Sequence, residues 1–498
     1  MKTLKSASLD GIEAVSVDVE STFTKGLPSF SIVGMASTAI QESKERVKAA
    51  LLTNEFKFPP KRITINLSPS EIAKKGSQID LAIALLIALQ ESKSKLEDFH
   101  VFGELGLDGK LKDTKSIFVL VLSLARQGLL KNVLIPKESI PKISTIPNIN
   151  IYAVDNLDEA ILFFNSEDKE KYKVENKIFK YDFVEVDGIK YFYTKSYEDD
   201  FSDIKGQNIA KKAALISAAG NHNILLEGSP GCGKSMIAKR LPYIMPPMQL
   251  NEILDIAKLE SLHGKQPSFK PLRSNVTPHH SGTKASIVGG TTIGEVALAN
   301  HGVLFFDELP HFSKSVLESL REPLQDYEIS ISRVNEKVKY PTKFLFIAAQ
   351  NPCPCGNLLS QTKNCRCSDI EIQRYKNKIS DPFIDRIDLY IVMNEIKKDD
   401  LANVDSQTLH KKVIDAFVMQ KRRGQVELNG KLSDKDIKNY CVLDDASQNI
   451  LDMAIDKFSL SFRSINKVLK VARTIADLEC RENIEQKDVV EALSYRKR

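Results

Sequence analysis

Apolar residues in the first 165 positions alternate between short strand-like runs and longer helical stretches. Ile63-Thr-Ile-Asn-Leu67 alternates as a half-buried strand does, and residues 77–90 carry the strongly apolar pattern of a buried helix. Two short runs between Val101 and Leu111 meet at Asp108-Gly109, a dipeptide typical of hairpin turns. This mixture predicts an α+β domain over residues 1–165.

A charge-rich stretch begins after residue 165 and predicts a linker over residues 166–198. Within it, Tyr181–Val186 and Ile189–Thr194 flank Asp187-Gly188, which is a second hairpin signal. The linker is therefore expected to carry a hairpin whose role is packing.

Strand patterns alternate with helical patterns over residues 199–395, as in proteins built on a mostly parallel sheet. The candidate strands are Asn223–Leu226, Gly302–Phe306 and Lys343–Ala348. Helical patterns dominate residues 396–498, where apolar positions recur with helical spacing between Ile465 and Ala476. The chain is thus predicted to combine an α/β core with a helical C-terminal domain.

Composition limits the class of protein. The chain has 498 residues, and at about 100–200 residues per domain this length predicts roughly two to four domains. The net charge of +5 excludes a histone-like chain, and 42% hydrophobic residues exclude wholesale disorder. The longest apolar runs, such as Leu81–Leu89, are shorter than the ~20 residues of a membrane-spanning helix, and no apolar leader follows Met1. We expect a soluble, cytoplasmic protein without a membrane segment.

The segment that follows the Asn223 strand carries a phosphate-binding pattern. Gly228-x4-Gly233-Lys234-Ser235 has the Walker A spacing, in which backbone N–H groups of a glycine-rich loop converge on phosphate oxygens. Lys234 is expected to reach the β and γ phosphates of ATP, and the Ser235 hydroxyl to bind Mg²⁺. The remaining residues of the predicted nucleotide-binding loop are Gly228, Ser229, Pro230, Gly231, Cys232 and Gly233.

A second strand ends in two acidic residues, as a Walker B motif does. Gly302-Val-Leu-Phe-Phe is followed by Asp307 and Glu308. Asp307 is expected to hold Mg²⁺, and Glu308 to orient and activate the attacking water. Acidic pairs are common at strand ends, but this pair follows a Walker A motif at a suitable distance along the chain.

Four of the seven cysteines form a cluster: Cys353, Cys355, Cys365 and Cys367. Four thiolates at this spacing can close around a structural Zn²⁺ ion, although C-x-C pairs are less diagnostic than the usual C-x2-C pairs. Reduced cysteines without metal are the alternative. A zinc loop over residues 353–367 therefore stays open at this point.

Several of these segments resemble magnesium-chelatase-type AAA+ ATPases, and within them the YifB/ComM group. The matching stretches are Ile204–Ala213, the Walker A segment, Gly289-Gly290, Gly302–Leu309 and Ala348–Gly356. The resemblance covers nearly the whole chain and is weakest around residues 165–198. It implies a hexameric ring with ATP bound at subunit interfaces. It also implies a DNA branch-migration helicase that acts in natural transformation.

The resemblance also assigns residues outside the two Walker motifs. Asn351 matches sensor 1, whose amide holds the γ-phosphate or the lytic water. Arg386 matches the arginine finger that enters the neighbouring subunit's site, with Arg374 as a rival. Arg463 resembles sensor 2 of the helical lid. An ordinary surface or ion-pair role is the alternative for each of these residues.

The segment from Ser330 to Lys343 predicts a basic hairpin, and the family has its pre-sensor-1 hairpin at this place. Its four basic residues and Glu336 leave a local excess of three positive charges on an almost balanced chain. In a ring, such hairpins would contact the DNA backbone through Arg333, Lys337 and Lys339. A solvated turn without a partner is the alternative. The segment His279–Gly290 is a second candidate for contacts in the ring's pore, and its adjacent histidines are expected to point in different directions.

The N-terminal region resembles the Lon protease domain. Lon peptidases use a Ser/Lys dyad, but the corresponding stretch here, Lys75–Asp80, lacks the flanking glycine pattern and a suitably placed lysine. Only Ser77 keeps a peptidase interpretation open. We therefore expect a non-proteolytic N-terminal domain. For the whole chain we expect an ATP- and Mg²⁺-dependent motor that acts on single-stranded or branched DNA. A chelatase-like remodeller of a partner protein is the alternative.

Overall fold

The computed structural model describes residues 2–92, 94–177, 179–333, 336–397, 399–401 and 403–496. The chain divides into two compact units: Met1–Lys180 with Ala257–Ser268, and Tyr181–Ile256 with Phe269–Arg498. Each unit has its own apolar core, as expected for separately packed domains.

The first unit is built on a mixed eight-stranded sheet with the strand order β10-β9-β8-β5-β1-β2-β4-β3. The predicted strand at residues 63–67 is β4, and the predicted helix at 77–90 is the shorter helix α2. The helix starts late because the Gln78 amide donates to the carbonyl oxygens of Ala7 and Lys75, which fixes the preceding segment as a loop. The strands of the sheet are β1 (Lys2–Asp10), β2 (Glu13–Thr24), β3 (Ser29–Val33), β4 (Arg62–Ser68), β5 (Phe99–Val101), β8 (Asn132–Pro136), β9 (Asn150–Val154) and β10 (Lys173–Val174).

Helices and a small hairpin complete this unit, and α2 is buried on nearly all sides, which explains the apolar run that follows its first residue, Asp80. The predicted turn at Asp108-Gly109 joins β6 (Glu104–Leu105) to β7 (Leu111–Lys112). The α+β class predicted for the region is confirmed. The helices are α1 (Thr38–Thr53), α2 (Asp80–Ala88), α3 (Ile117–Arg126), α4 (Ile140–Ile143) and α5 (Leu157–Asn165).

The second unit contains a parallel five-stranded sheet with the strand order β14-β15-β18-β13-β19. The three predicted strands are β13, β15 and β18. Since all strands are parallel, their carboxyl ends lie at one edge of the sheet, where ligands bind in such folds. The strands are β13 (Ile224–Gly228), β14 (Asn275–Val276), β15 (Val303–Phe306), β18 (Leu345–Gln350) and β19 (Leu389–Met393).

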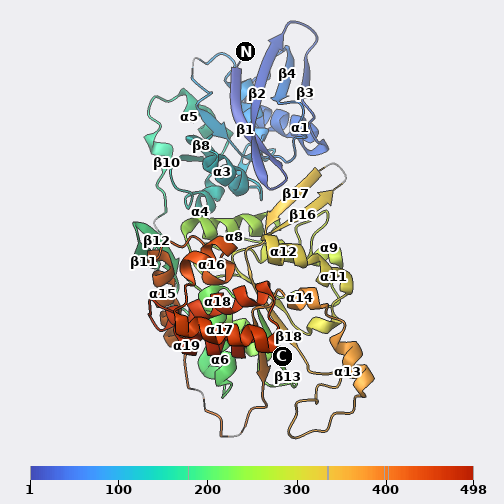
Figure 1. The fold of residues 1–498 in the computed structure, drawn as a ribbon. Coiled ribbons are helices and arrows are strands. Elements are labelled where there is room, and N and C mark those ends of the chain that lie inside the picture. Colours follow the sequence, from blue (N-terminus) through green and yellow to red (C-terminus); the bar gives the residue numbers. More distant parts are fainter. Residues whose placement is uncertain are drawn as a thin grey trace. The chain divides into compact units, whose positions relative to one another are not determined.

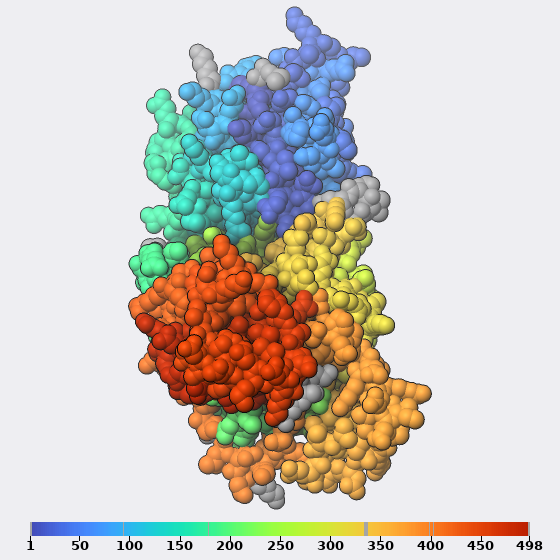
Figure 2. Space-filling model, in the orientation of Figure 1, coloured from blue at the N-terminus to red at the C-terminus, as the bar shows by residue number. Residues whose placement is uncertain are grey.

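The C-terminal region is helical, as predicted, and its apolar stripe in α18 packs into the same core as α6 and the central strands. Figure 1 shows these helices in red as one cluster, and they form a continuous surface in Figure 2. The helices are α15 (Ser406–Arg422), α16 (Asp434–Tyr440), α17 (Asp445–Phe458), α18 (Phe462–Leu478) and α19 (Gln486–Ser494).

The second unit also contains two hairpins. The hairpin predicted around Asp187-Gly188 joins β11 (Asp182–Val186) to β12 (Ile189–Tyr193), and both turn residues have positive φ, as a type I′ turn requires. The predicted basic hairpin is formed by β16 (Glu328–Arg333) and β17 (Glu336–Pro341). The remaining helices of the chain are α6 (Asn208–Gly220), α7 (Lys234–Arg240), α8 (Leu250–Leu262), α9 (Lys284–Ile287), α10 (Glu295–Leu298), α11 (Lys314–Ser319), α12 (Arg321–Asp326), α13 (Asp369–Lys376) and α14 (Asp381–Ile384).

Candidate nucleotide site

The Walker A segment forms a loop between buried strand β13 and helix α7. Gly231 and Gly233 have φ angles of +83° and +96°, a region that L side chains rarely adopt. These two glycines allow the chain to turn sharply from the strand into the helix. The loop therefore has the strand–loop–helix context of a phosphate-binding site.

Lys234 folds back over this loop. Its Nζ donates to the carbonyl oxygens of Gly228 at 2.7 Å and Ser229 at 3.1 Å, and to Asn351 Oδ1 at 3.2 Å. Asn351 directly follows β18, which pairs with β13 in the sheet. The structure thus brings the Walker A lysine and the asparagine expected to act as sensor 1 into direct contact.

The two residues expected to hold Mg²⁺ also meet at this edge. Ser235 Oγ donates to Asp307 Oδ2 at 2.8 Å, and Asp307 directly follows β15. A hydroxyl and a carboxylate oxygen are the hard ligands that Mg²⁺ prefers. The donor set therefore fits Mg²⁺ bound together with a triphosphate.

Glu308 follows in a left-handed conformation with φ of 54°, and its side chain is about half exposed. His280 lies beside it, with Nδ1 3.7 Å from Glu308 Oε2. The expectation that His279 and His280 diverge is wrong, since their rings stack with centroids 4.4 Å apart. The segment 279–290 therefore reaches the residue predicted to activate water.

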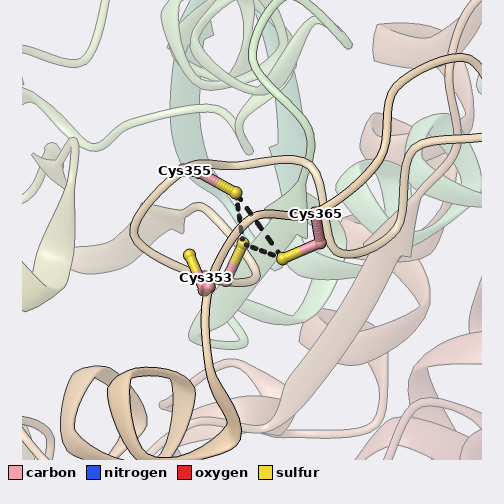
Figure 3. Close-up of side chains that lie close together, drawn as sticks. Cys353, Cys355 and Cys365 are labelled. Carbon is pink, nitrogen blue, oxygen red and sulfur yellow. Dashed lines mark hydrogen bonds between the residues drawn. The ribbon is translucent and has the colours of Figure 1, made fainter.

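The four clustered cysteines lie on the loop between β18 and α13 (Figure 3). The Sγ–Sγ distances are 3.4 Å for Cys353–Cys355, 3.7 Å for Cys353–Cys365 and 3.6 Å for Cys355–Cys365. Cys367 joins them, and all four sulfur atoms lie within 4.8 Å of one another. The four thiols can therefore act as ligands of one ion.

The arginines assigned by resemblance lie away from the Walker residues. Asn223 Nδ2 donates to the Arg386 carbonyl at 2.9 Å, and Asn223 precedes β13, whereas the Walker A loop follows that strand. Arg463 lies beside Arg386, because both guanidinium groups donate to Gln325 Oε1, at 3.5 and 2.6 Å. Arg374, the rival finger, is exposed on α13.

A pocket of about 640 Å³ opens at these two arginines. Burial, followed by the charges of Arg463 and Arg321, lowers the pKa of Arg386. Burial also lowers the pKa of Lys431 to about 8. Four aspartates, Asp326, Asp385, Asp388 and Asp434, also line this pocket, so its lining carries charges of both signs. The basic residues of the pocket are Arg386, Lys431, Arg463, Lys467 and Lys470.

The three lysines of this pocket were not predicted from the sequence. Lys467 and Lys470 follow Arg463 at intervals that share one face of α18, so helical spacing was a usable signal. Lys431 comes from the short turn before α16, and no local pattern connects it with the others. Only the tertiary fold reveals its contribution.

The basic hairpin has less free charge than its sequence indicates. Lys339 Nζ pairs with Glu328 at 2.8 Å, and Lys343 Nζ pairs with Glu427 at 2.6 Å. Lys337 is exposed, and no ion pair is found for it within the described part of the chain. The side chain of Arg333 lies outside the described residues. Lys337 is thus the described hairpin lysine most available to an external phosphate.

Ser77, which kept a peptidase interpretation open, donates a hydrogen bond to the Glu104 carboxylate. A Ser/Lys dyad requires instead that the hydroxyl face a lysine amine. This pairing gives the peptidase interpretation no support.

None of the helices in the described ranges has the length and apolar character needed to cross a membrane.

Comparisons with known proteins identify the family of this chain. Family models of magnesium chelatase subunit ChlI match residues 200–401 and 19–139, and a model of its C-terminal region matches residues 403–496. Competence protein ComM of Haemophilus influenzae is 37% identical, with 98% of this chain and 95% of the relative covered. YifB of Salmonella typhimurium is 35% identical, again with 98% of this chain and 95% of the relative covered. Lon protease of Haemophilus influenzae is 28% identical, with 31% of this chain and 20% of the relative covered.

Proposed function

We propose, on the premise that this chain belongs to the YifB/ComM family of magnesium-chelatase-type AAA+ ATPases, that it is an ATP-hydrolysing ring motor acting on DNA. The observation that carries the proposal is the convergence of Lys234, Ser235, Asp307 and Asn351 at one edge of a parallel sheet. Those four side chains supply the cation, the metal ligands and the amide that nucleotide cleavage requires.

The residues at this edge divide the chemistry between them. Lys234 would exchange its carbonyl partners for the β and γ phosphates when ATP binds, and Asn351, which contacts Lys234, would bind the γ-phosphate. Ser235 and Asp307 hold Mg²⁺, which, when bound, neutralises phosphate charge. Glu308 then orients the attacking water and accepts its proton.

Cleavage requires a second chain in this proposal. Arg386 and Arg463 share the acceptor Gln325 Oε1 on α12, and the Arg386 carbonyl is bonded to Asn223, at the end of β13 opposite the Walker A loop. A neighbouring subunit that inserts its triphosphate next to this pocket would meet both arginines. A closed ring, a hexamer in our proposal, repeats this interface between every pair of subunits.

The β16–β17 hairpin is the proposed contact with DNA. Lys337 carries an exposed ammonium group near the hairpin tip, and a ring would present one hairpin per subunit to a strand at its centre. The name of the ComM relative refers to competence. We extend that role to this chain and propose branch migration of single-stranded or branched DNA during recombination.

A chelatase-like remodeller of a partner protein is the second candidate function. The ion pairs of Lys339 with Glu328 and of Lys343 with Glu427 favour it, because they reduce the charge that the hairpin offers to DNA. ATPase activity is common to both candidates. DNA binding and strand displacement separate them.

The experiment compares the wild-type protein with Lys337→Ala and with the Lys337→Ala/Lys339→Ala double variant. DNA affinity is expected to fall, and the slope of log K against log salt to decrease by about one for each phosphate contact removed. The matched control is Lys411→Ala, which removes an exposed lysine of α15. Unchanged DNA affinity in the double variant would leave the remodeller as the better proposal.

A Holliday-junction assay with and without ATP tests the motor itself. The wild-type protein is expected to separate the junction only with hydrolysable ATP, and Glu308→Gln is expected to bind the junction without separating it. ATP hydrolysis without any junction separation would contradict the branch-migration proposal.

A further inference from the structure

We propose that Cys353, Cys355, Cys365 and Cys367 bind one Zn²⁺ ion and that this ion fixes the position of Asn351. The four sulfur atoms lie within 4.8 Å of one another, although they come from two separate C-x-C pairs (Figure 3). The metal site stands on these thiols alone. Its effect on Asn351 rests on the proposed ATPase function.

The distances between the sulfur atoms fit a single tetrahedral ion. A Zn–S bond of about 2.3 Å gives an edge of about 3.8 Å for a tetrahedron of four sulfurs. The separations of Cys353, Cys355 and Cys365 are 3.4, 3.7 and 3.6 Å, close to this edge. A disulfide would require about 2.05 Å, and all four thiols are free. A polynuclear iron–sulfur cluster would hold its cysteines farther apart, so the geometry favours one ion.

Backbone N–H groups of the loop lie close to the sulfur atoms. The N–H groups of Asn357 and Arg366 interact with Cys355 Sγ, and that of Cys367 interacts with Cys365 Sγ. Such N–H···S contacts orient metal-bound thiolates and offset their negative charge. Arg366 adds a positive charge between Cys365 and Cys367, which reduces the net charge of a four-thiolate site.

The cysteine loop supports Asn351 on the side of its own strand. Cys353 is fully buried and lies two residues after Asn351. Gly356 packs so closely on the Walker A loop that an added Cβ would lie 2.7 Å from Pro230 Cδ. An ion bound to Cys353 and Cys355 would therefore hold in place the short segment from Asn351 to Gly356, which packs on the phosphate-binding loop.

The other end of the loop supports Asn351 through helix α13. Cys367 directly precedes Ser368, the N-cap of α13, which has a complete capping box with Glu371. The hydroxyl oxygen of Tyr375 on this helix interacts with the backbone N–H of Asn351. One ion bound by both C-x-C pairs would thus connect the two segments that contact Asn351.

Metal analysis of the full-length protein, purified without chelator or metal-affinity resin, tests the site itself. One zinc per chain is expected in the wild-type protein, and at least a tenfold loss in Cys365→Ser/Cys367→Ser. Cys480→Ser, which changes an exposed cysteine outside the cluster, is the matched control and should keep its zinc. A metal-free wild-type protein, iron in place of zinc, or equal loss in the control would overturn the site.

Steady-state ATP hydrolysis tests the effect on Asn351. The double cysteine variant is expected to lose about 10–100-fold in kcat with little change in ATP affinity, as Asn351→Ala should, because the amide acts on the γ-phosphate. Zinc loss with unchanged kcat would overturn the connection to Asn351. A wild-type protein that contains zinc but hydrolyses no ATP would contradict the proposed function and leave the metal site intact.

Discussion

Arg386→Ala tests whether each ATP is cleaved by two neighbouring chains. The Arg386 carbonyl is bonded to Asn223, at the start of β13, and the Walker A loop begins where that strand ends. Five strand residues at about 3.3 Å each place the Arg386 carbonyl roughly 16 Å from the start of the Walker A loop, which is farther than an arginine side chain reaches. Arg386 must therefore act on a neighbour's ATP or on none.

The expected size of the effect follows from the charge that Arg386 would neutralise. Removal of an arginine finger costs about 10³–10⁵ in kcat, whereas ATP binding at the chain's own Lys234 should persist. Lys234→Ala alone should also be inactive, because it loses ATP binding. In rings assembled at random from equal amounts of the two variants, about one quarter of the interfaces combine an intact Walker site with an intact Arg386.

Phosphate release from the mixed rings is the measurement, with co-assembly followed by native mass spectrometry. We expect recovery to about a quarter of the wild-type rate. A mixture of Lys234→Ala with Glu308→Gln is the control and should stay inactive, since both changes affect the same side of the interface. If co-assembled rings show no recovery, or Arg386→Ala alone keeps full activity, the reasoning about the shared site is refuted.

Three further predictions follow from other parts of the second unit. Glu308→Gln should retain ATP binding but lower kcat by about 10²–10⁴, measured by phosphate release; an unchanged rate would remove Glu308 from the mechanism. Burial alone would raise the pKa of Glu252, but Arg273 and His301 lower it to about 2, so its contribution to stability is present above about pH 4.5 and lost as the pH falls toward 2. The difference in Tm between wild type and Glu252→Gln should therefore be largest at neutral pH and shrink below about pH 4.5, and a difference independent of pH would contradict this. Asp477 is fully buried and pairs with two arginines, so Asp477→Ala should lower the free energy of unfolding by about 3–5 kcal/mol in urea titrations, whereas the exposed control Asp452→Ala should change it little; equal effects would contradict the prediction.

The sequence by itself determined the features that depend on neighbouring residues. The Walker A loop, the strands around it and the turn at Asp187-Gly188 follow from glycine positions and apolar runs, and the structure has them at the expected places. The apolar stripe of α18 likewise identified the face that enters the core. These features were predictable because local backbone geometry and the burial pattern suffice to specify them.

Only the tertiary structure decided which distant side chains meet. The order of the parallel strands brings Asn351 to Lys234, and the packing of α18 next to α14 brings Arg463 to the acceptor used by Arg386. The same long-range packing pairs Lys343 with Glu427, which a count of charges along the hairpin could not anticipate. Contacts of this kind depend on strand order and helix packing over tens to hundreds of residues, and no local spacing in the chain encodes them.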